Sequence, residues 1–513
     1  MSDSSPSPFY DVRTFGAAAD GHTLDTSALN RAITATAEAG GGTVRFPAGT
    51  YLSHTIRLRS HVTLELGPGA ILKAAPAPDA EGEPGYDLAE PNHWGTEHGY
   101  QDFGHSHFRN SLLWGEDLEN VAIVGRGHID GTHLGKGLSK HSSERPGTAN
   151  KAIALKNCRG VLLRDFSLYR GGHFALLATG LDDLTIDNLR VDTNRDGLDI
   201  DGCRNVRISN CAINTPNDDA IVLKTSYALG ELRPTENVTI TNCLVCGFDL
   251  GTLLDGTYGR KTRHSPDRDG PTGRIKLGTE SNGDFRNITI ANCVFERSRG
   301  LAIESVDGAT IENVVVTGLA MRDVTNSAIF LRLGNRARGP EGTAVGAIRG
   351  VSISHVVASG VDGRFPIQLQ GLPGHPIEDV RLSDIRVHAR GGISMEQVAA
   401  QPDELVNRFF LQAQEGETGV TGPREPFEVP LRERAYPEPS MFGLLPARAL
   451  YARHLHGLDL RDVVFTFAAP DARPAIVLEA VDACRAEHVL IERDSPTADD
   501  LIQRDCEGVR FLD

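Results

Sequence analysis

Apolar and polar residues alternate in short runs that recur along most of the chain. From about residue 120, each copy has an apolar-polar-apolar core, then Asn or Asp, then a second short run and a glycine-rich turn. The copies include Val161-Leu162-Leu163-Arg164-Asp165, Leu184-Thr185-Ile186-Asp187-Asn188, Val206-Arg207-Ile208-Ser209-Asn210, Val238-Thr239-Ile240-Thr241-Asn242 and Ile288-Thr289-Ile290-Ala291-Asn292. A period of two predicts strands with one buried face, and a step of about 22 residues is about one turn of a parallel β-solenoid.

The N-terminal region has a helical period instead. Leu29, Ile33 and Ala37 share one face of a segment that opens at Asp25 or Thr26 and stops at Gly40-Gly41-Gly42. Such a helix would cap the open end of the first sheets, whose backbone groups are otherwise unpaired. We therefore expect an all-β fold, a single-stranded parallel β-helix with an N-terminal capping helix and long turn insertions. Leucine-rich repeats have a similar period, but they need repeated leucines and an intervening helix, and this repeat has neither.

The expected domain organisation is a disordered tail over 1–8 and one β-helix domain over 9–513. Longer steps of the repeat predict insertions, which a solenoid accommodates at its turns. We expect them at about 76–112, 134–149, 225–234, 255–273 and 395–447. The insertion 255–273 carries a basic island, interpreted as a substrate-binding loop with a solvated loop as the alternative; its cationic residues are Arg260, Lys261, Arg263, His264 and Arg268.

Composition narrows the classes of partner. The formal net charge of -16 argues against nucleic acid and against an anionic membrane surface, both of which bind through excess Lys and Arg. Residues 1–8 carry neither a basic region nor an apolar run, so we expect a cytoplasmic protein. No segment is apolar over the length needed to cross a bilayer. The oligomeric state is left open.

The cysteines predict buried thiols instead of a disulfide framework. Four of the eight follow Asn at equivalent places in the repeat, namely Cys158, Cys211, Cys243 and Cys293. Cys243 and Cys246 have zinc-knuckle spacing, but no second Cys or His pair lies near them in the sequence. We expect no metal and no cofactor.

Five carboxylates are concentrated around two short strands. They are Asp196, Asp199, Asp201, Asp218 and Asp219. Gathering like charges raises the pKa of at least one carboxyl group, which suits an acid/base pair near neutral pH. An acidic solvated face and a calcium site are the alternatives. Catalysis is favoured because the rest of the chain reads as a scaffold for this cluster.

These motifs resemble a known family. Asn194-Arg195-Asp196-Gly197-Leu198-Asp199 followed by Asn217-Asp218-Asp219 resembles the polygalacturonases, glycoside hydrolase family 28, whose motifs are Asn-x-Asp-Gly-x-Asp and an Asp-Asp pair. Phe15-Gly16, Asp20-Gly21 and Pro47-Ala48-Gly49-Thr50-Tyr51 resemble the pectin-lyase-like β-helix superfamily, although lyases and phage tailspikes share that pattern. The resemblance implies a right-handed β-helix.

The resemblance also implies roles for the acids. Asp218 matches the general acid that protonates the glycosidic oxygen, and Asp196 with Asp219 matches the pair that activates water. An inverting enzyme of this kind separates acid and base by about 6.5 to 9.5 Å. Because Asp218 and Asp219 are adjacent, a bend near Pro216-Asn217 is required for both to face one cleft. Residues expected to contact the substrate or support the acids are Asn194, Asp199, Asp201, Lys224 and His173; Lys224 could instead only neutralise the cluster.

The departures from the family concern substrate recognition. Where the family has Gly-His-Gly, the chain reads Phe248-Asp249-Leu250-Gly251, and where it has the carboxylate-binding Arg-Ile-Lys, the chain reads Ala302-Ile303-Glu304. Glu304 would repel a galacturonate. Arg274-Ile275-Lys276 lies one coil earlier, and we interpret its match to the family motif as coincidental. Arg274, Lys276 and Arg260 could nevertheless form an anion-binding site at a different position. Glu280 and Glu304 are further candidates for substrate binding.

We therefore expect an inverting, exo-acting glycosidase of α-linked oligosaccharides such as galacturonate- or rhamnose-containing pectin fragments, with a substrate shifted away from polygalacturonate. A β-helix lyase or sugar epimerase remains an alternative enzyme class. A tailspike-like glycan-binding protein without catalytic activity is the other alternative.

Overall fold

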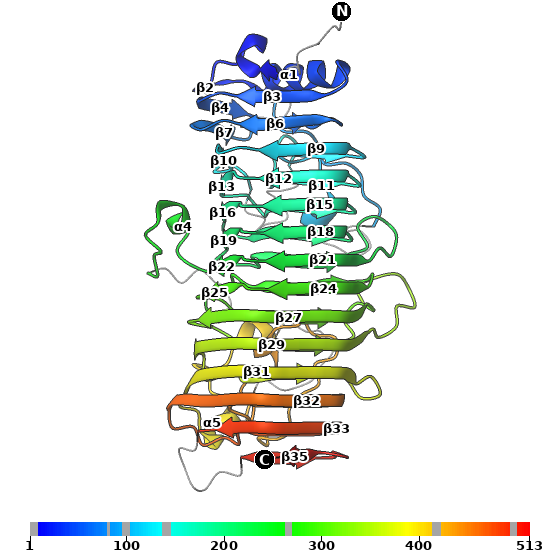
Figure 1. Cartoon of the computed structure of the whole chain (residues 1–513), viewed down its shortest axis with the longest axis vertical. Helices are drawn as coiled ribbons and strands as arrows, with labels where there is room; N and C mark the ends of the chain where they lie inside the picture. The colour runs from blue at the N-terminus through cyan, green and yellow to red at the C-terminus, as the bar shows by residue number, and fades with distance from the viewer. Residues whose placement is uncertain are drawn as a thin grey trace, which may run out of the picture. The chain divides into compact units, whose positions relative to one another are not determined.

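The computed structural model describes residues 9–79, 83–94, 103–135, 145–261, 269–412, 422–492 and 500–512. They fall into two compact units, and Figure 1 shows the parallel strands of which both are built. Unit 1 comprises 1–222, 226–243 and 248–260, and unit 2 comprises 223–225, 244–247 and 261–513. The predicted tail over 1–8 lies outside the described residues, and the prediction of one domain over 9–513 stays a prediction.

The strands of unit 1 stack in three parallel ladders. The first ladder contains β1 (Phe9–Asp11), β3 (Gly42–Phe46), β6 (Val62–Leu66), β9 (Glu119–Val124), β12 (Arg159–Arg164), β15 (Asp182–Asp187), β18 (Arg204–Ser209) and β21 (Thr235–Thr241). The second contains β2 (Asp20–Leu24), β4 (Gly49–Ser53), β7 (Ala70–Ala74), β10 (His128–Asp130), β13 (Ser167–Tyr169), β16 (Arg190–Asp192) and β19 (Ala212–Asn214). The third contains β5 (Ile56–Arg57), β8 (Leu113–Glu116), β11 (Lys151–Lys156), β14 (Phe174–Thr179) and β17 (Asp196–Asp201).

Unit 2 repeats this arrangement. Its first ladder contains β24 (Phe285–Ala291), β27 (Thr310–Arg322), β29 (Ala347–Val361), β31 (Ile377–Gly391), β32 (Leu450–Ala469), β33 (Ile476–Ile491) and β35 (Arg510–Leu512). The second begins with β22 (Leu244–Cys246) and β25 (Val294–Glu296) and continues into β27. The third contains β23 (Ile275–Ser281), β26 (Leu301–Ser305), β28 (Ile329–Leu333), β30 (Ile367–Gln370) and β34 (Leu501–Arg504), with parts of β32 and β33. β20 (Ile221–Thr225) is divided between the two units.

The period-two pattern places the cores. In unit 1, Val161, Leu184, Val206 and Val238 occupy one register position on successive strands, and all four side chains are buried. The stacking of like aliphatic side chains on consecutive coils removes apolar surface from water along the whole solenoid. The predicted parallel β-solenoid is confirmed.

The N-terminal helix is confirmed as α1 (Thr26–Glu38), which follows the short 3-10 helix η1 (Val12–Phe15). Its buried face includes Leu29 and Ile33, as the sequence pattern predicts. It ends where Gly41 has a φ of 112° and a Cβ would lie 2.6 Å from the His61 carbonyl oxygen, so only glycine fits. The buried Asp25 accepts hydrogen bonds from the Ala18 and Ala19 amides and fixes the start of the helix.

Asparagines form the turn after the first ladder in several coils. Asn188, Asn210 and Asn242 have φ values of 55°, 58° and 56°, a left-handed conformation that Asn tolerates better than most residues. The four cysteines that follow Asn are buried, as predicted, and all eight cysteines are free. The prediction that the four occupy equivalent places is wrong for Cys158, which follows β11 of the third ladder, whereas Cys211, Cys243 and Cys293 follow strands of the first ladders. Burial raises the pKa of the Cys158 thiol to about 11.

Long connections lie where the repeat lengthens, at 75–112, 131–150, 226–234, 247–274 and 392–449. The first holds α2 (Phe103–Ser106), the fourth α4 (Thr252–Asp255), and the last α5 (Met395–Ala400), α6 (Arg408–Gln412) and the 3-10 helix η3 (Pro439–Phe442). One further connection, 334–346, was not predicted. Among the described residues, no helix is both long and apolar enough to span a membrane.

Candidate active site

Two loops of unit 1 bring the predicted catalytic acids together. Asp196 opens β17, and the Gly197 amide donates to the Asp219 carbonyl oxygen at 2.9 Å, so the two acidic motifs are neighbours. The chain bends just before β20, where the Thr215 hydroxyl donates to the Asp218 carbonyl oxygen at 2.8 Å and the Asp219 amide donates to Asp218 Oδ1 at 3.1 Å. The bend that the adjacent acids require is therefore present.

The three acids form a compact carboxylate cluster. One oxygen from each of Asp196, Asp218 and Asp219 lies within 4.8 Å of the others. Asp196 and Asp219 are each 4% exposed, whereas Asp218 is half-buried. The Arg195 guanidinium lies 2.9 Å from Asp218 Oδ2 and orients that carboxylate. The most accessible acid is thus the one that the resemblance assigns to the glycosidic oxygen.

His105 joins this cluster, although the sequence analysis did not single it out. It lies in α2, and its Nε2 is 3.5 Å from Asp199 Oδ2. One ligand atom each of His105, Asp196 and Asp199 lies within 4.8 Å of the others. The segment around α2 is held by the buried Glu90 carboxylate, which accepts the Phe108 and Arg109 amides at 2.8 and 3.0 Å. The insertion therefore places His105 next to the acids of β17.

Asp201 has a different environment from the other acids. It is buried at the end of β17 and accepts hydrogen bonds from the Ser226 amide and hydroxyl. Burial raises the pKa of Asp201 to about 6, although the Ser226 hydrogen bonds act in the opposite direction. These hydrogen bonds anchor the turn after β20.

The other predicted residues of unit 1 lie near these elements. The Asn217 side-chain amide donates to Asn194 Oδ1 at 2.6 Å and ties the two motif loops together. His173 is buried, with its ring centroid 4.4 Å from that of Phe174 and 6.2 Å from that of His105. Phe174 pairs in register with Asp196, so His173 is placed beside the start of β17.

Arg260 is exposed and lies in the connection that contains α4. Its guanidinium stands over the Phe248 ring at 5.3 Å, at the place where the family histidine is missing. The connection is held by the buried Asp192 carboxylate, which accepts the Gly251, Leu253 and Leu254 amides; burial raises the pKa of Asp192. Arg263, His264 and Arg268 of the predicted basic loop lie outside the described residues.

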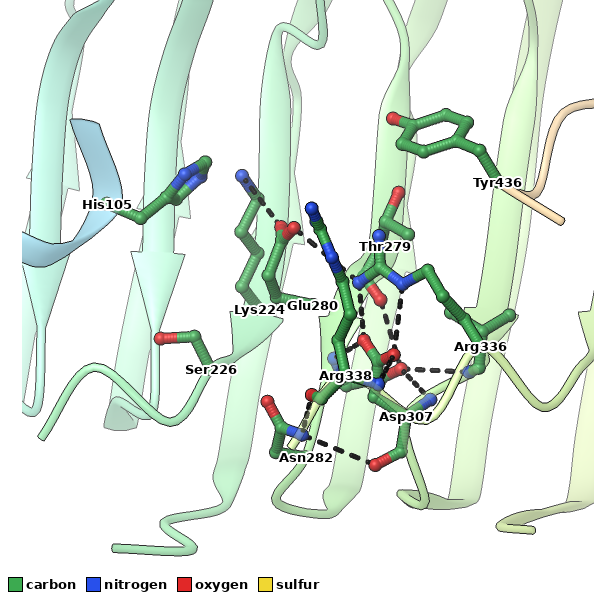
Figure 2. A network of polar contacts seen from close by, with 12 residues as sticks. His105, Lys224, Ser226, Thr279, Glu280, Asn282, Asp307, Arg336, Arg338 and Tyr436 are labelled. Atoms are coloured by element: carbon green, nitrogen blue, oxygen red, sulfur yellow. Dashed lines mark hydrogen bonds and ion pairs between the residues drawn. The ribbon is translucent and has the colours of Figure 1, made fainter. Parts of the chain in front are cut away.

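The remaining predicted residues belong to unit 2, where they form ion pairs. Lys224 Nζ lies 3.3 Å from Glu280 Oε2 (Figure 2). Lys276 Nζ lies 3.4 Å from Glu304 Oε2 and donates to the Thr279 hydroxyl at 2.8 Å. The Glu304 charge, expected to repel a uronate, is therefore neutralised inside the protein.

Arg274 is held by an acid of the last long insertion. Its guanidinium lies 3.0 Å from Glu438 Oε2, and Arg299 lies 3.2 Å from Oε1 of the same carboxylate. All three side chains are almost completely buried. Arg274 and Lys276 thus have internal partners in unit 2, and their assignment to a relocated anion site stays a prediction.

The described residues also offer two sets of metal ligands. One is His105, Asp196 and Asp199, and the other is Asp196, Asp218 and Asp219. Both are oxygen-rich, which suits a hard divalent cation such as Ca²⁺ better than a soft metal. The expectation of no metal stays untested.

Comparison with known families agrees with this geometry. Residues 98–249, which contain the acidic cluster, match the glycosyl hydrolases family 28. Residues 9–92 match a family described as rhamnogalacturonase A/epimerase, pectate lyase-like.

Curated relatives give the same family. The chain is 24% identical over 398 residues to a probable polygalacturonase of Vitis vinifera, covering 73% of each chain. It is 29% identical over 217 residues to an exo-poly-α-D-galacturonosidase of Dickeya chrysanthemi, covering 41% of this chain and 33% of that protein.

Solved structures give the fold. A family 28 exopolygalacturonase of Yersinia enterocolitica has a TM-score of 0.63 at 17% identity, covering 99% of this chain and 79% of that one. A hyperthermoactive exopolygalacturonase of Thermotoga maritima has a TM-score of 0.57 at 20% identity, covering 75% and 88%. These likenesses establish a right-handed parallel β-helix. Residues 98–249 are thus similar to the glycosyl hydrolases of family 28, and the polygalacturonase relatives indicate that the chain is a glycosidase.

Proposed function

We propose that the protein hydrolyses α-linked, galacturonate-containing oligosaccharides from one chain end with inversion at the anomeric carbon. The observation that carries the proposal is the convergence of Asp196, Asp218 and Asp219 within 4.8 Å on two neighbouring loops. Such a cluster can give a proton at one carboxyl group and take one at another.

In the proposed reaction Asp218 donates its proton to the glycosidic oxygen as the bond to the anomeric carbon breaks. Asp196 and Asp219 hold a water molecule between them and accept its proton as its oxygen attacks that carbon from the opposite face. Asp218 suits the first role because it is more exposed than the other two. His105 and Asp199 orient Asp196 from the side of α2.

The spacing of the carboxyl groups bears on whether the reaction inverts or retains the configuration at the anomeric carbon. Inverting glycosidases separate the two carboxyl groups by about 6.5 to 9.5 Å and retaining ones by about 5 to 5.5 Å. The closest oxygens here lie within 4.8 Å, which is shorter than the predicted inverting range. Because Asp196 and Asp219 share the water molecule in the proposed reaction, that water can lie to one side of Asp218.

The proposed substrate class rests on the relatives. The Dickeya relative is named an exo-poly-α-D-galacturonosidase, and the Yersinia and Thermotoga structures are exopolygalacturonases. Exo action on short galacturonate- or rhamnose-containing fragments is therefore part of the proposal.

The test combines a substrate panel with the stereochemistry of the product. Wild type is incubated with oligogalacturonides and rhamnogalacturonan fragments, and the anomeric protons are followed by NMR in the first minutes. We expect the inverted anomer first and release of the terminal sugar, with Asp218→Asn lowering kcat by about 100-fold or more. First appearance of the retained anomer, or full activity of Asp218→Asn, would contradict the proposal.

The two ligand sets favour one alternative, a lyase that cleaves by β-elimination with a divalent cation on the aspartates. Such an enzyme loses activity with a chelator and forms an unsaturated product that absorbs ultraviolet light. Hydrolysis predicts neither. The expected cytoplasmic location remains part of the proposal and is checked by fractionating cells that express the full chain.

A further inference from the structure

Two connections of unit 1 hold an exposed tryptophan in a fixed position. Trp94 lies between β7 and α2 and is 41% exposed. Its backbone amide donates to Asn92 Oδ1 at 2.8 Å. The Asn92 side-chain amide donates to the Ser106 carbonyl oxygen at 2.6 Å and to the Ala228 carbonyl oxygen at 3.1 Å. The backbone at Trp94 is therefore tied both to α2 and to the connection 226–234.

The indole ring of Trp94 packs on the connection 226–234. Its centroid lies 5.3 Å from that of the Tyr227 ring, and the two rings meet edge to face at 85°. Gly230 lies so close to the indole that a Cβ there would be 2.2 Å from Trp94 Nε1, and the φ of Gly230 is 76°. Both the conformation and the approach of the ring therefore require glycine at this position. These contacts fix the ring, while a large part of its surface stays open to solvent.

Both connections also contact the acids of β17. His105, which lies in α2, has its Nε2 3.5 Å from Asp199 Oδ2. The Ser226 amide, at the start of the other connection, donates to Asp201 Oδ1 at 2.6 Å. The segments that hold Trp94 are therefore the ones that contact the candidate active site within unit 1.

Neither family match includes Trp94, because it lies between the matched stretches 9–92 and 98–249. Single exposed apolar side chains are common on protein surfaces, so exposure alone indicates nothing. This indole differs because a side-chain hydrogen bond, a second ring and a glycine hold it, so the entropy of ordering it was lost on folding. A rigid aromatic surface of this kind offers contact area to a ligand at little further cost.

We propose that Trp94 is a platform on which one pyranose ring of the oligosaccharide packs, an inference that rests on the proposed function. The C–H groups on one face of a pyranose form an apolar surface that can lie against the face of an indole. The contact removes apolar surface of both partners from water and does not require a charge on the sugar. Trp94 thus supplies a binding contribution that is independent of the carboxylate groups of the ligand.

The first experiment uses Trp94 as its own reporter. The chain has two tryptophans, so Trp114→Phe in the Asp218→Asn protein leaves Trp94 as the single tryptophan of a protein whose hydrolysis is slowed. Hexagalacturonate is titrated into this protein while the fluorescence emission is recorded. We expect a saturable shift of the emission as the indole loses contact with water. Unchanged emission at concentrations where calorimetry shows binding would overturn the proposal.

Calorimetric titration measures the strength of the contact. In the Asp218→Asn background, we expect Trp94→Ala to raise Kd for hexagalacturonate about tenfold and Trp94→Phe to raise it less, because phenylalanine keeps part of the aromatic surface. The same ratio is expected for methyl-esterified hexagalacturonate and at high salt, since the contact needs no charge. Leu88→Ala, an exposed apolar residue of the same connection, is the control and should leave Kd unchanged. Equal Kd in Trp94→Ala and its parent, or a loss confined to the charged ligand at low salt, contradicts a stacking platform.

The two measurements separate this inference from the proposed reaction. If wild type hydrolyses no galacturonide but the emission and Kd change as expected, hydrolysis fails and the Trp94 platform stands. If wild type hydrolyses galacturonides while Trp94→Ala and its parent bind alike, the platform fails alone. Absence of hexagalacturonate binding to both proteins also overturns the platform.

Discussion

His105 brings a ring nitrogen close to the carboxylates of unit 1, and it comes from a different segment than the acids do. Asp196 and Asp199 lie on β17, and the histidine comes from α2, about ninety positions earlier in the chain. A polar contact to buried carboxylates matters because unsatisfied charge in a protein interior is costly. At the scale of single residues, the candidate site therefore includes a contact between segments that are far apart in the chain.

Replacement of His105 tests that contact. His105→Ala removes the group 3.5 Å from Asp199 Oδ2, so we expect kcat on the best substrate to fall by about tenfold or more, with the circular dichroism spectrum retained. His133→Ala, an exposed histidine of the same unit, is the matched control. Unchanged kcat in His105→Ala would remove His105 from the site.

Asp201 predicts a pH dependence of stability. Burial raises its pKa from 3.8 to about 6, so the folded state holds the proton more tightly than the unfolded state. The stabilisation from this group is therefore complete below pH 3.8 and is lost as the pH rises through about 6. Relative to wild type, Asp201→Asn should gain up to about 3 kcal/mol in the free energy of unfolding between pH 4 and 7. Urea denaturation across this range measures the difference, which would stay constant if Asp201 did not titrate.

At the scale of elements, buried ion pairs hold the insertion 392–449 to the strands of unit 2. Glu438, which precedes η3, contacts Arg274 before β23 and Arg299 before β26. The apolar residues Met441 and Phe442 of η3 pack in a buried cluster with Ala302 and Tyr451. The described residues around η3 thus pack into the core of unit 2.

Removal of the Glu438 charge should destabilise unit 2 strongly. Glu438→Gln removes the negative charge that the buried Arg274 and Arg299 guanidinium groups share, so we expect a loss of about 3 to 5 kcal/mol in the free energy of unfolding. Urea denaturation compares it with Glu425→Gln, an exposed glutamate of the same insertion. A loss no larger than that of the control would show that the ion pairs contribute little.

At the scale of the whole molecule, most of the cysteine thiols are buried in the solenoid interior. Seven of the eight cysteines are buried, and Cys506 near the C-terminal end is partly exposed. Burial raises the pKa of Cys203 and of Cys484 to about 12, so these thiols are unreactive as well as inaccessible.

Thiol labelling gives the corresponding prediction. Native protein should react with a chromogenic disulfide reagent at about one thiol per chain, and urea-unfolded protein at all eight. Cys506→Ser should abolish the fast reaction. Rapid labelling of several thiols in the native protein would contradict a closed core in the two units.

The sequence by itself determined the repeat, the capping helix and the carboxylates that meet on two loops. Alternation of apolar residues at a fixed step dictates stacked strands, and residues one step apart must then be neighbours, as Asp196 and Asp219 are. Only the tertiary structure decided what the insertions contribute: His105 beside Asp199, Glu438 beside Arg274, and Trp94 beside Tyr227. Connections carry no period, so their contacts arise from packing between segments far apart in the chain.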